Sequence, residues 1–348
     1  MKYCELYRKE LLDALNQLDL SPLYHKSILI TGGSGLILSV LVDVLCTANC
    51  ERNADISIYL AARSEQEVID RFTAFYQDSR LNYAYYDALL PVSFDFKADY
   101  VIHGASNAHP SAYSTEPVET LLANVTGIKE LLDYARKVGS QRVLYISSSE
   151  VYGKKEEQRP YYENDYGFVD ILNTRACYPS GKRAAETLCA AYKAEYGIET
   201  VMVRPGHIYG PTIIPSDSRA TAQFARDVIS GRDIVMKSDG SQLRSYCYNV
   251  DCATAILTVL LKGTAGEAYN ISNRNSIVSI RQIAEEMAKQ TGRKVIFENP
   301  TDEEKKSYNM MDNSSLNSEK LESLGWAAQY SLSKGVQHML SILMEQEA

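Results

Sequence analysis

Tyr178 and Lys182 lie four residues apart in a segment with a helical pattern, and together they could perform acid–base chemistry. Residues at this spacing share one face of a helix, one turn apart, so the phenol and the ammonium would be neighbours. We expect the positive charge to stabilise the phenolate and lower the phenol pKa from about 10 toward neutrality. Tyrosine then becomes usable as a general base. Taken alone, such a pair is more often a surface coincidence than a catalytic site.

A serine-rich segment, 147–153 (Ser-Ser-Ser-Glu-Val-Tyr-Gly), supplies further groups that could take part in this chemistry. It directly follows a predicted strand at 142–147, and open α/β sheets bind their ligands at the carboxyl ends of their strands. We therefore predict that Ser148, Ser149 and Glu150 share a site with the tyrosine–lysine pair.

A glycine-rich turn lies within residues 27–39 (Ser-Ile-Leu-Ile-Thr-Gly-Gly-Ser-Gly-Leu-Ile-Leu-Ser), between a predicted strand and a predicted helix. This context favours a dinucleotide whose pyrophosphate lies at the helix N-terminus. Gly32 permits the tight turn, and Gly35 lets the backbone approach the phosphates. The alternative is a helix-capping loop that binds nothing. The other cofactor contacts predicted in this turn are Ser34, Leu36 and Ile37.

Two positions depart from the usual dinucleotide-binding pattern. Leu38 occupies the third glycine position, where a bulky side chain should push the helix away from the strand. The second predicted strand ends in Leu-Ala-Ala-Arg-Ser (60–64), with Arg63 where an acidic residue would hold the ribose hydroxyls. Arg63 could instead neutralise a 2′-phosphate, so NADP stays an alternative to NAD; it could also be a solvated loop arginine.

Apolar, β-branched runs alternate with helical patterns over the first two hundred residues, which predicts a parallel sheet covered by helices on both faces. The fold class is therefore α/β, a Rossmann-type doubly wound sheet. The predicted strands are 27–31, 56–61, 83–86, 100–103, 142–147 and 200–204. The predicted helices are 36–47, 65–77, 118–138 and 177–196, with Gly197 as the cap of the last one.

After Arg204 the regular alternation ends. Glycines and prolines open a loop-rich stretch, followed by predicted helices near 219–230, 250–262 and 279–291 and by an interrupted polar segment at 237–245. This pattern indicates a smaller C-terminal substrate lobe interleaved with the sheet. The predicted division is an N-terminal helical extension (1–24), a dinucleotide-binding domain (25–204, with 246–272 returning to it) and a substrate lobe (205–245 and 273–348).

Composition narrows the classes of function. The 348-residue chain is 45% hydrophobic and 23% charged, which is typical of a globular protein. A net charge of −8 and scattered basic residues argue against nucleic acid as a partner. Without a signal peptide or an apolar run of about 20 residues, we expect a cytoplasmic protein with no membrane contact. Seven dispersed cysteines suggest neither a disulfide framework nor a metal site.

Several linked motifs resemble the extended short-chain dehydrogenase/reductases, in the NAD-dependent epimerase/dehydratase group. Beside the segments above, they are Asn-Val-Thr-Gly (124–127), Arg-Pro-Gly-His-Ile-Tyr-Gly-Pro (204–211), the segment 239–251 and Leu-Gly-Trp (324–326). The resemblance implies NAD as cofactor, a nucleotide-sugar substrate and a homodimer.

The same resemblance implies a role for individual residues. Tyr178 would be the base, Lys182 the group that adjusts its pKa, and Ser148 the hydroxyl that steadies the substrate oxygen. The resemblance also implies cofactor contacts at Asp87, Ala105 and Asn124, the last supporting the active-site strand, and substrate contacts at Ser149, His207 and Arg244, the last reaching the diphosphate.

The reaction depends on what happens to a 4-keto sugar, which the family forms by passing hydride to the nicotinamide. A 4,6-dehydratase typically has Asp-Glu after the strand-end hydroxyl residue, whereas this chain has Ser149-Glu150. Ser-Glu resembles UDP-glucuronate decarboxylases, as does the segment 163–187, although His207 stands where those enzymes usually have asparagine.

We therefore expect a decarboxylase, with a 4-epimerase or a 4,6-dehydratase as alternatives. A non-catalytic NAD(P)-binding sensor is the alternative of another class. The retained Ser148, Tyr178 and Lys182 argue against it, because a sensor has no need of proton-transfer groups.

Overall fold

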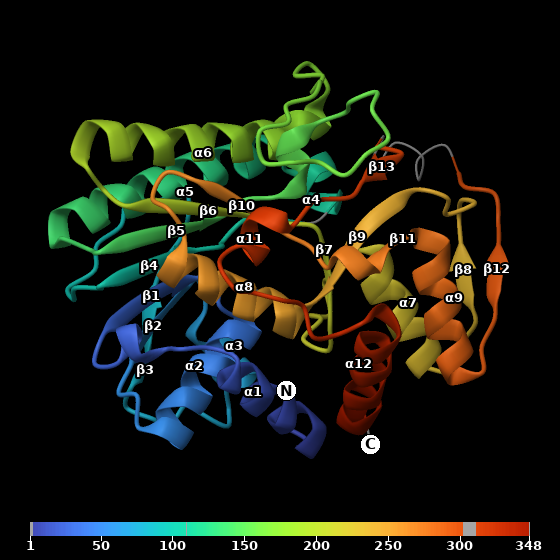
Figure 1. Ribbon diagram of the computed structural model, residues 1–348, viewed down its shortest axis with the longest axis horizontal. Helices are drawn as coiled ribbons and strands as arrows, with labels where there is room; N and C mark the ends of the chain where they lie inside the picture. Colours follow the sequence, from blue (N-terminus) through green and yellow to red (C-terminus); the bar gives the residue numbers. More distant parts are fainter. Residues whose placement is uncertain (1–2, 109, 302–310, 348) are drawn as a thin grey trace.

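The computed structural model describes residues 3–108, 110–301 and 311–347. Its largest sheet has seven parallel strands in the order β10-β6-β5-β4-β1-β2-β3 (Figure 1). The strands are β1 (Ser27–Thr31), β2 (Ser57–Ala62), β3 (Leu81–Tyr85), β4 (Tyr100–His103), β5 (Arg142–Ile146), β6 (Thr200–Pro205) and β10 (Ala268–Ile271). The strand order reverses between β1 and β4, and such a reversal opens a ligand crevice at the carboxyl ends of the strands.

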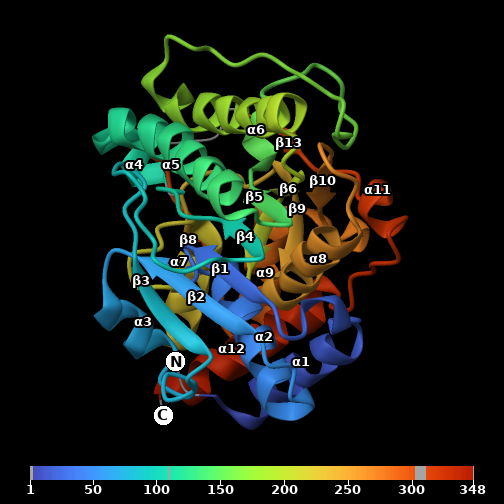
Figure 2. The same cartoon turned by 90° about the vertical axis from the view of Figure 1, so that its left-hand side faces the viewer.

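Helices cover both faces of this sheet, so the predicted doubly wound α/β fold is confirmed. On one face lie α5 (Pro117–Val138) and α6 (Cys177–Tyr196), which pack side by side (Figures 1 and 2). On the other face α2 (Leu38–Arg52) packs against α8 (Asn249–Lys262), and α1 (Glu5–Asn16) packs on both. Twelve of the 15 residues of α2 are buried, as expected for a helix enclosed between a sheet and other helices.

The smaller lobe lies beside the carboxyl ends of the strands and is built from short strands and helices (Figure 1). Its central strand β9 (Leu243–Tyr248) pairs with β11 (Ile277–Ser279), β13 (Asn313–Ser314) and β7 (His207–Tyr209), while β8 (Ile234–Met236) pairs with β12 (Val295–Phe297). The helices are α7 (Ala220–Ile229), α9 (Ile280–Thr291) and α12 (Leu332–Glu347).

Two expectations about individual elements need correction. The segment 237–245 was expected to be an interrupted polar stretch, but strand β9 begins within it at Leu243. The pairing that forms β9 comes from residues distant in sequence, so it leaves no local pattern. The helix expected at 65–77 is shorter, α3 (Glu65–Arg71), and Phe72 directly after it is buried in the core.

The N-terminal helix is part of the core packing. Tyr7 of α1 is fully buried and donates a hydrogen bond of 2.5 Å to Asp43 of α2. Asp43 also forms an ion pair of 2.5 Å with Arg71 of α3, so three helices meet at this carboxylate.

None of the helices in the described ranges is both long and apolar enough to cross a membrane. The exact domain division stays a prediction.

Candidate active site

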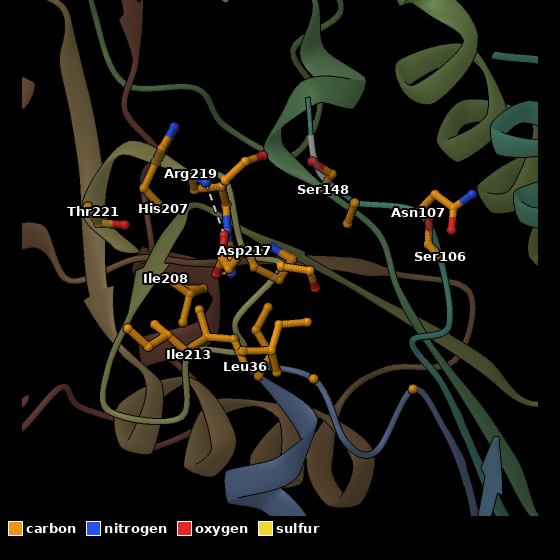
Figure 3. A pocket seen from close by; sticks show the side chains of 18 of the residues that line it. Leu36, Ser106, Asn107, Ser148, His207, Ile208, Ile213, Asp217, Arg219 and Thr221 are labelled. Atoms are coloured by element: carbon orange, nitrogen blue, oxygen red, sulfur yellow. Dashed lines mark hydrogen bonds and ion pairs between the residues drawn. The ribbon is translucent and has the colours of Figure 1, made fainter. Parts of the chain in front are cut away.

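A cavity of about 1800 Å³ lies between the carboxyl ends of the sheet strands and the smaller lobe. Ser106, Asn107 and Ser148 lie on one side of it, and His207 and Arg219 lie on the other (Figure 3). The cavity brings together nearly all the residues predicted from sequence: Gly32, Ser34, Gly35, Leu36, Ile37, Arg63, Asp87, Ala105, Ser148, Ser149, Glu150, Tyr178, Lys182, His207 and Arg244.

The glycine-rich turn has the geometry that a pyrophosphate needs. Gly32 has φ +73°, and a Cβ there would lie 2.7 Å from the Gly104 carbonyl carbon, so no other residue fits without a shift. A Cβ on Gly35 would have only the Gly32 oxygen nearby, at 3.4 Å, and would otherwise meet open space. The α2 N-terminus has no side-chain cap, so its free N–H groups are available to an anion. The residues present therefore fit a dinucleotide.

Leu38 is accommodated by a glycine from another strand end. Its side chain is 3% exposed, and a Cβ on Gly104 would lie 2.4 Å from Leu38 Cδ1. The missing side chain of Gly104, which follows β4, leaves the space that Leu38 fills. We expected Leu38 to push the helix away from the strand, and that expectation did not take into account the space that Gly104 leaves.

We predict that Gly35→Val folds normally but binds NAD at least about tenfold more weakly, because the new side chain projects toward the phosphates. Calorimetric titration with NAD measures the loss, and the melting temperature checks the fold. Gly139→Asn is a matched control, since Gly139 ends α5 in a left-handed conformation that asparagine tolerates, with no atom within 4 Å of its Cβ. Unchanged affinity in Gly35→Val would place the dinucleotide elsewhere.

Lys182 and Tyr178 lie on the same face of α6, as their spacing predicts. The Lys182 ammonium lies 5.7 Å from the centre of the Tyr178 ring and donates a hydrogen bond of 2.8 Å to the Ile146 carbonyl at the end of β5. Burial lowers the pKa of Lys182 to about 7, because the charged form loses its hydration. The lysine is thus hydrogen-bonded to the strand end from which the predicted site residues Ser148 and Ser149 follow.

The predicted lowering of the Tyr178 pKa is not what the structure shows. Burial raises the pKa of Tyr178 to about 12, the Glu150 carboxylate raises it further, and the Ser148 hydroxyl acts in the opposite direction. Desolvation of the phenolate therefore outweighs the nearby ammonium, whose own pKa burial lowers. The sequence could reveal the pair but not its degree of burial.

Sequence reasoning missed Tyr113, which lies against the candidate base. Its ring stacks on that of Tyr178 with 4.7 Å between the centres, and it reaches this position from α4 (Pro110–Thr115). The two tyrosines and Cys177 form a small buried cluster. This contact fixes the orientation of the Tyr178 phenol, and the local sequence around Tyr113 does not predict it.

Glu150 is held by a second residue that the sequence did not reveal, Arg175. The guanidinium donates two parallel hydrogen bonds to the carboxylate, Nη1 to Oε2 at 2.9 Å and Nη2 to Oε1 at 3.0 Å. This bidentate arrangement is the most specific form of an arginine–carboxylate contact. Both side chains are largely buried and both line the cavity, so the glutamate carboxylate is fixed close to Tyr178.

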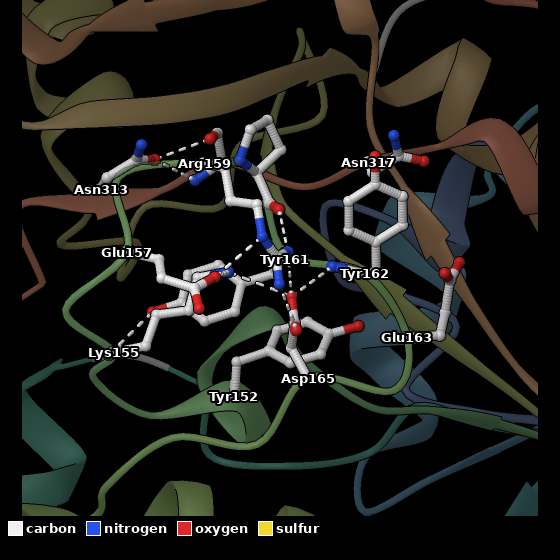
Figure 4. A network of polar contacts seen from close by, with 12 residues as sticks. Tyr152, Lys155, Glu157, Arg159, Tyr161, Tyr162, Glu163, Asp165, Asn313 and Asn317 are labelled. Carbon is white, nitrogen blue, oxygen red and sulfur yellow. Dashed lines mark hydrogen bonds and ion pairs between the residues drawn. The ribbon is translucent and has the colours of Figure 1, made fainter.

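The long segment between Gly153 and Arg175 is fastened by a polar network (Figure 4). Arg159 donates to both carboxylate oxygens of Asp165, at 2.7 and 2.9 Å, and the Lys155 ammonium lies 3.1 Å from the same carboxylate. The Tyr161 amide donates to the Ser315 carbonyl of the smaller lobe at 2.8 Å. These contacts fix the chain that delivers Arg175 to the cavity.

Arg244 and His207 face the cavity from paired strands, β9 and β7. Arg244 is 2% exposed, donates a hydrogen bond of 2.8 Å to the Leu243 carbonyl, and forms no ion pair with any residue in the described ranges. A buried guanidinium without a carboxylate favours an anionic ligand. Burial lowers the pKa of His207 to about 3, and Arg244 and Arg219 lower it further, so the imidazole is neutral. The Nδ1 atom of His207 is buried and has no hydrogen-bond partner among the described residues.

Asn124 is the one predicted cofactor contact that does not line the cavity. Its side chain is buried, accepts a hydrogen bond of 3.0 Å from Ser106 and one of 3.4 Å from the Tyr145 hydroxyl of β5, and donates to the Thr120 carbonyl at 2.7 Å. The geometry fits support of the strand and of the cavity wall, rather than direct contact with the cofactor.

The sequence model of the NAD dependent epimerase/dehydratase family matches residues 28–272, which is more than half of the chain. The chain belongs to this epimerase/dehydratase family. Among curated proteins it is 30% identical over 311 residues to UDP-glucuronic acid decarboxylase 6 of Arabidopsis thaliana, covering 89% of this chain and 86% of that protein. As a member of this family, the chain is an NAD-dependent enzyme that modifies a nucleotide-sugar.

Solved structures of epimerase/dehydratase enzymes share the fold. A dTDP-glucose 4,6-dehydratase of Streptomyces venezuelae with bound NAD has a TM-score of 0.79, with 22% identity over 92% of this chain and 98% of that one. A UDP-glucuronic acid 4-epimerase of Bacillus cereus with UDP-glucuronic acid and NAD has a TM-score of 0.77, with 21% identity over 92% of this chain and 100% of that one. At these identities the likeness shows the fold alone.

Proposed function

We propose that the protein decarboxylates UDP-glucuronate through a 4-keto intermediate. The observation that carries the proposal is the position of Glu150, which Arg175 holds in the same cavity as Ser148, Tyr178 and Lys182. The likeness to UDP-glucuronic acid decarboxylases supports the choice of substrate. So does the buried Arg244, which has no carboxylate partner in the described part of the chain and suits an anionic ligand.

The first step is oxidation at C4 of the sugar. NAD supplies the hydride acceptor for this step. Tyr178 accepts the proton of the 4-hydroxyl, and Ser148 lies beside the phenol and hydrogen-bonds the same substrate oxygen. Lys182 in its protonated form offsets part of the cost of forming the buried phenolate, whose pKa burial raises.

The second step is loss of the carboxylate. Oxidation makes the sugar a β-keto acid, so the bond between C5 and the carboxylate carbon breaks, and its electron pair passes to the C4 carbonyl as an enolate. Carbon dioxide leaves, and C5 takes a proton. Tyr178 gives its proton back to the C4 oxygen, and C4 takes back the hydride that the reduced cofactor held at the glycine-rich turn would supply, which completes the nucleotide-linked pentose. Glu150 orients the sugar and helps to reprotonate the enolate in this scheme.

The substrate phosphates are assigned to the smaller lobe. Arg244 is a buried cation with no carboxylate partner in the described part of the smaller lobe, whereas Arg219 is already bound to Asp217 at 2.9 and 2.5 Å. We assign the diphosphate to Arg244, with the neutral imidazole of His207 beside it as a hydrogen-bond donor.

One experiment distinguishes decarboxylation from the two other reactions of the family, 4,6-dehydration and 4-epimerisation. The purified enzyme is incubated with NAD and with UDP-glucuronate, or with UDP-, dTDP-, CDP- and GDP-linked hexoses, and the products are weighed by mass spectrometry. We expect UDP-glucuronate to lose the mass of carbon dioxide. Loss of water from a hexose would indicate a 4,6-dehydratase, and an isomer of unchanged mass a 4-epimerase; either result without decarboxylation overturns the proposal.

A non-catalytic sensor is the candidate of another class. It predicts that cofactor binds but that no nucleotide-sugar is converted in the incubations above. The arrangement of Ser148 with the buried Tyr178 and Lys182 favours the enzyme, because burying a lysine ammonium costs free energy that a structural role alone does not explain.

We also propose a homodimer in the cytoplasm. The outer face of α5 exposes Val118 and Leu122, and the segment before α6 exposes Phe168, Ile171 and Leu172, apolar side chains that a second copy would cover. All seven cysteines are free, which supports a reducing compartment.

A further inference from the structure

The N-terminal helix α1 connects the two lobes. It packs against α2 and α8, which cover the main sheet, and against α12 of the smaller lobe (Figure 1). The family model begins at residue 28, so α1 lies outside the matched part of the chain. Five of its 12 residues are buried, and one of them, Glu10, carries a carboxyl group, which proteins rarely bury without partners.

Glu10 joins α1 to two elements of the smaller lobe. Its side chain is 1% exposed. The hydroxyl of Tyr248, the last residue of β9, donates to the carboxyl group at 3.1 Å, and Nδ1 of His338 in α12 lies 2.6 Å from Oε1. Burial raises the pKa of Glu10 to about 8, and burial and nearby lysines lower the pKa of His338. Near neutral pH the carboxyl group therefore keeps its proton and donates a hydrogen bond to a neutral imidazole.

The same face of α1 also holds the dinucleotide-binding domain. Tyr7 lies three residues before Glu10, so the two side chains share one face of the helix. The Tyr7 hydroxyl donates to Asp43 of α2 at 2.5 Å, and Tyr3 donates to the same carboxylate. One turn of α1 is thus bound to α2, and the next turn is bound to β9 and α12.

A row of aromatic rings leads from this contact to the cavity. The ring of Tyr248 packs on that of Tyr209 with 5.6 Å between the centres, and Tyr209 packs on Tyr246 at 6.3 Å. The Tyr246 ring lies 5.8 Å from that of His207, and both of these residues line the cavity beside Arg244. Strands β7 and β9 pair in the register that brings these rings together. Because buried rings are closely packed, a shift at one end of the row moves its neighbours.

We infer that Glu10 is a positioning residue that, through Tyr248 and His338, holds the smaller lobe where β9 can bind the nucleotide-sugar. Glu10 does not line the cavity. Without its contacts, the binding energy of the substrate must also bring the lobe into place, so the loss appears in KM rather than in kcat. The inference rests on the proposed assignment of the substrate phosphates to Arg244, and not on the fate of the sugar.

The test compares Glu10→Ala with Glu10→Gln in the full chain. Glutamine has the shape of the protonated carboxyl group and can make both hydrogen bonds, whereas alanine makes neither. We expect Glu10→Ala to raise KM for the nucleotide-sugar about tenfold, and to change kcat and the calorimetric affinity for NAD less than about twofold. Glu10→Gln should stay within about twofold of the wild type in all three quantities. Tyr248→Phe should raise KM a few-fold and add little to the effect of Glu10→Ala, because both remove the same contact.

The variants are expected to fold, because the smaller lobe is also attached at another point. Asp251 of α8 accepts hydrogen bonds from the amides of Gln329 and Tyr330, just before α12, at 2.9 and 3.1 Å. Hydrogen–deuterium exchange without substrate gives a second readout. Glu10→Ala should exchange faster than the wild type in β9 and α12, and at the wild-type rate in β1.

Glu5→Ala is the matched control, because Glu5 is an exposed glutamate on the same helix. It should leave KM, kcat, NAD affinity and exchange unchanged. The inference is overturned if Glu10→Ala melts at a lower temperature with KM unchanged, if it loses NAD affinity as much as it raises KM, or if exchange changes in α1 alone. If the wild type converts a nucleotide-sugar other than UDP-glucuronate, the proposed function fails, and KM is then measured with that substrate.

Discussion

Tyr178→Phe is expected to lower kcat by about 10²–10⁴-fold while leaving the affinities for NAD and nucleotide-sugar nearly unchanged. The substitution removes one oxygen atom, and the ring that stacks on Tyr113 remains. The variant lacks the phenol that is proposed to take the proton of the 4-hydroxyl, so formation of the ketone fails before any later step. The measurement is turnover of the substrate identified by product mass, with both affinities determined by calorimetry.

Tyr192→Phe is the matched control for this prediction. Tyr192 lies on the same helix, and its hydroxyl donates a hydrogen bond of 2.9 Å to Asp133, outside the cavity. This variant should retain turnover and lose at most a little stability. If Tyr178→Phe stays within a few-fold of the wild-type kcat, the tyrosine–lysine pair is not the acid–base site.

The sequence predicted those parts of the fold and site whose determinants are local. All six strands expected in the main sheet are present within two residues of their expected bounds, because buried parallel strands are continuous apolar runs that need no distant partner to be recognised. Tyr178 and Lys182 share a helix that ends at Gly197, as predicted, so their relation follows from helix geometry alone.

The parts that were missed depend on contacts between distant segments. Arg175 meets Glu150 only because the intervening segment folds back on the smaller lobe, and Tyr113 reaches Tyr178 from another helix. Leu38 fits because Gly104, from a different strand end, leaves room for it. No spacing rule encodes such pairs, since each depends on the packing of the whole chain.

Glu150→Gln is the second substitution with a large expected effect, and its outcome separates the reactions of the family. In a decarboxylase, carbon dioxide leaves the β-keto acid without a base. The variant should therefore form the same product with kcat lowered about 10²-fold, because orientation and reprotonation are impaired. In a 4,6-dehydratase, Glu150 must remove the C5 proton, so the variant would stall with reduced nicotinamide absorbance accumulating. A 4-epimerase needs neither event and would tolerate the change.

The ion pair between Glu150 and Arg175 raises a second question, whether Glu150 takes part in the reaction or only stabilises the structure, and variants of both residues answer it. If Glu150 only anchors Arg175, the variant should melt at a lower temperature and keep ordinary turnover, and Arg175→Gln should behave in the same way. If Arg175 positions a carboxylate that takes part in the reaction, Arg175→Gln lowers kcat toward the value of Glu150→Gln, and Arg175→Lys restores part of the lost kcat. The kcat of the double variant is then no lower than that of either single variant. Wild-type turnover of UDP-glucuronate by Glu150→Gln would contradict the proposed role of Glu150 in orienting the sugar and reprotonating the enolate, and a lowered melting temperature would then assign the carboxylate to stabilising the cavity wall.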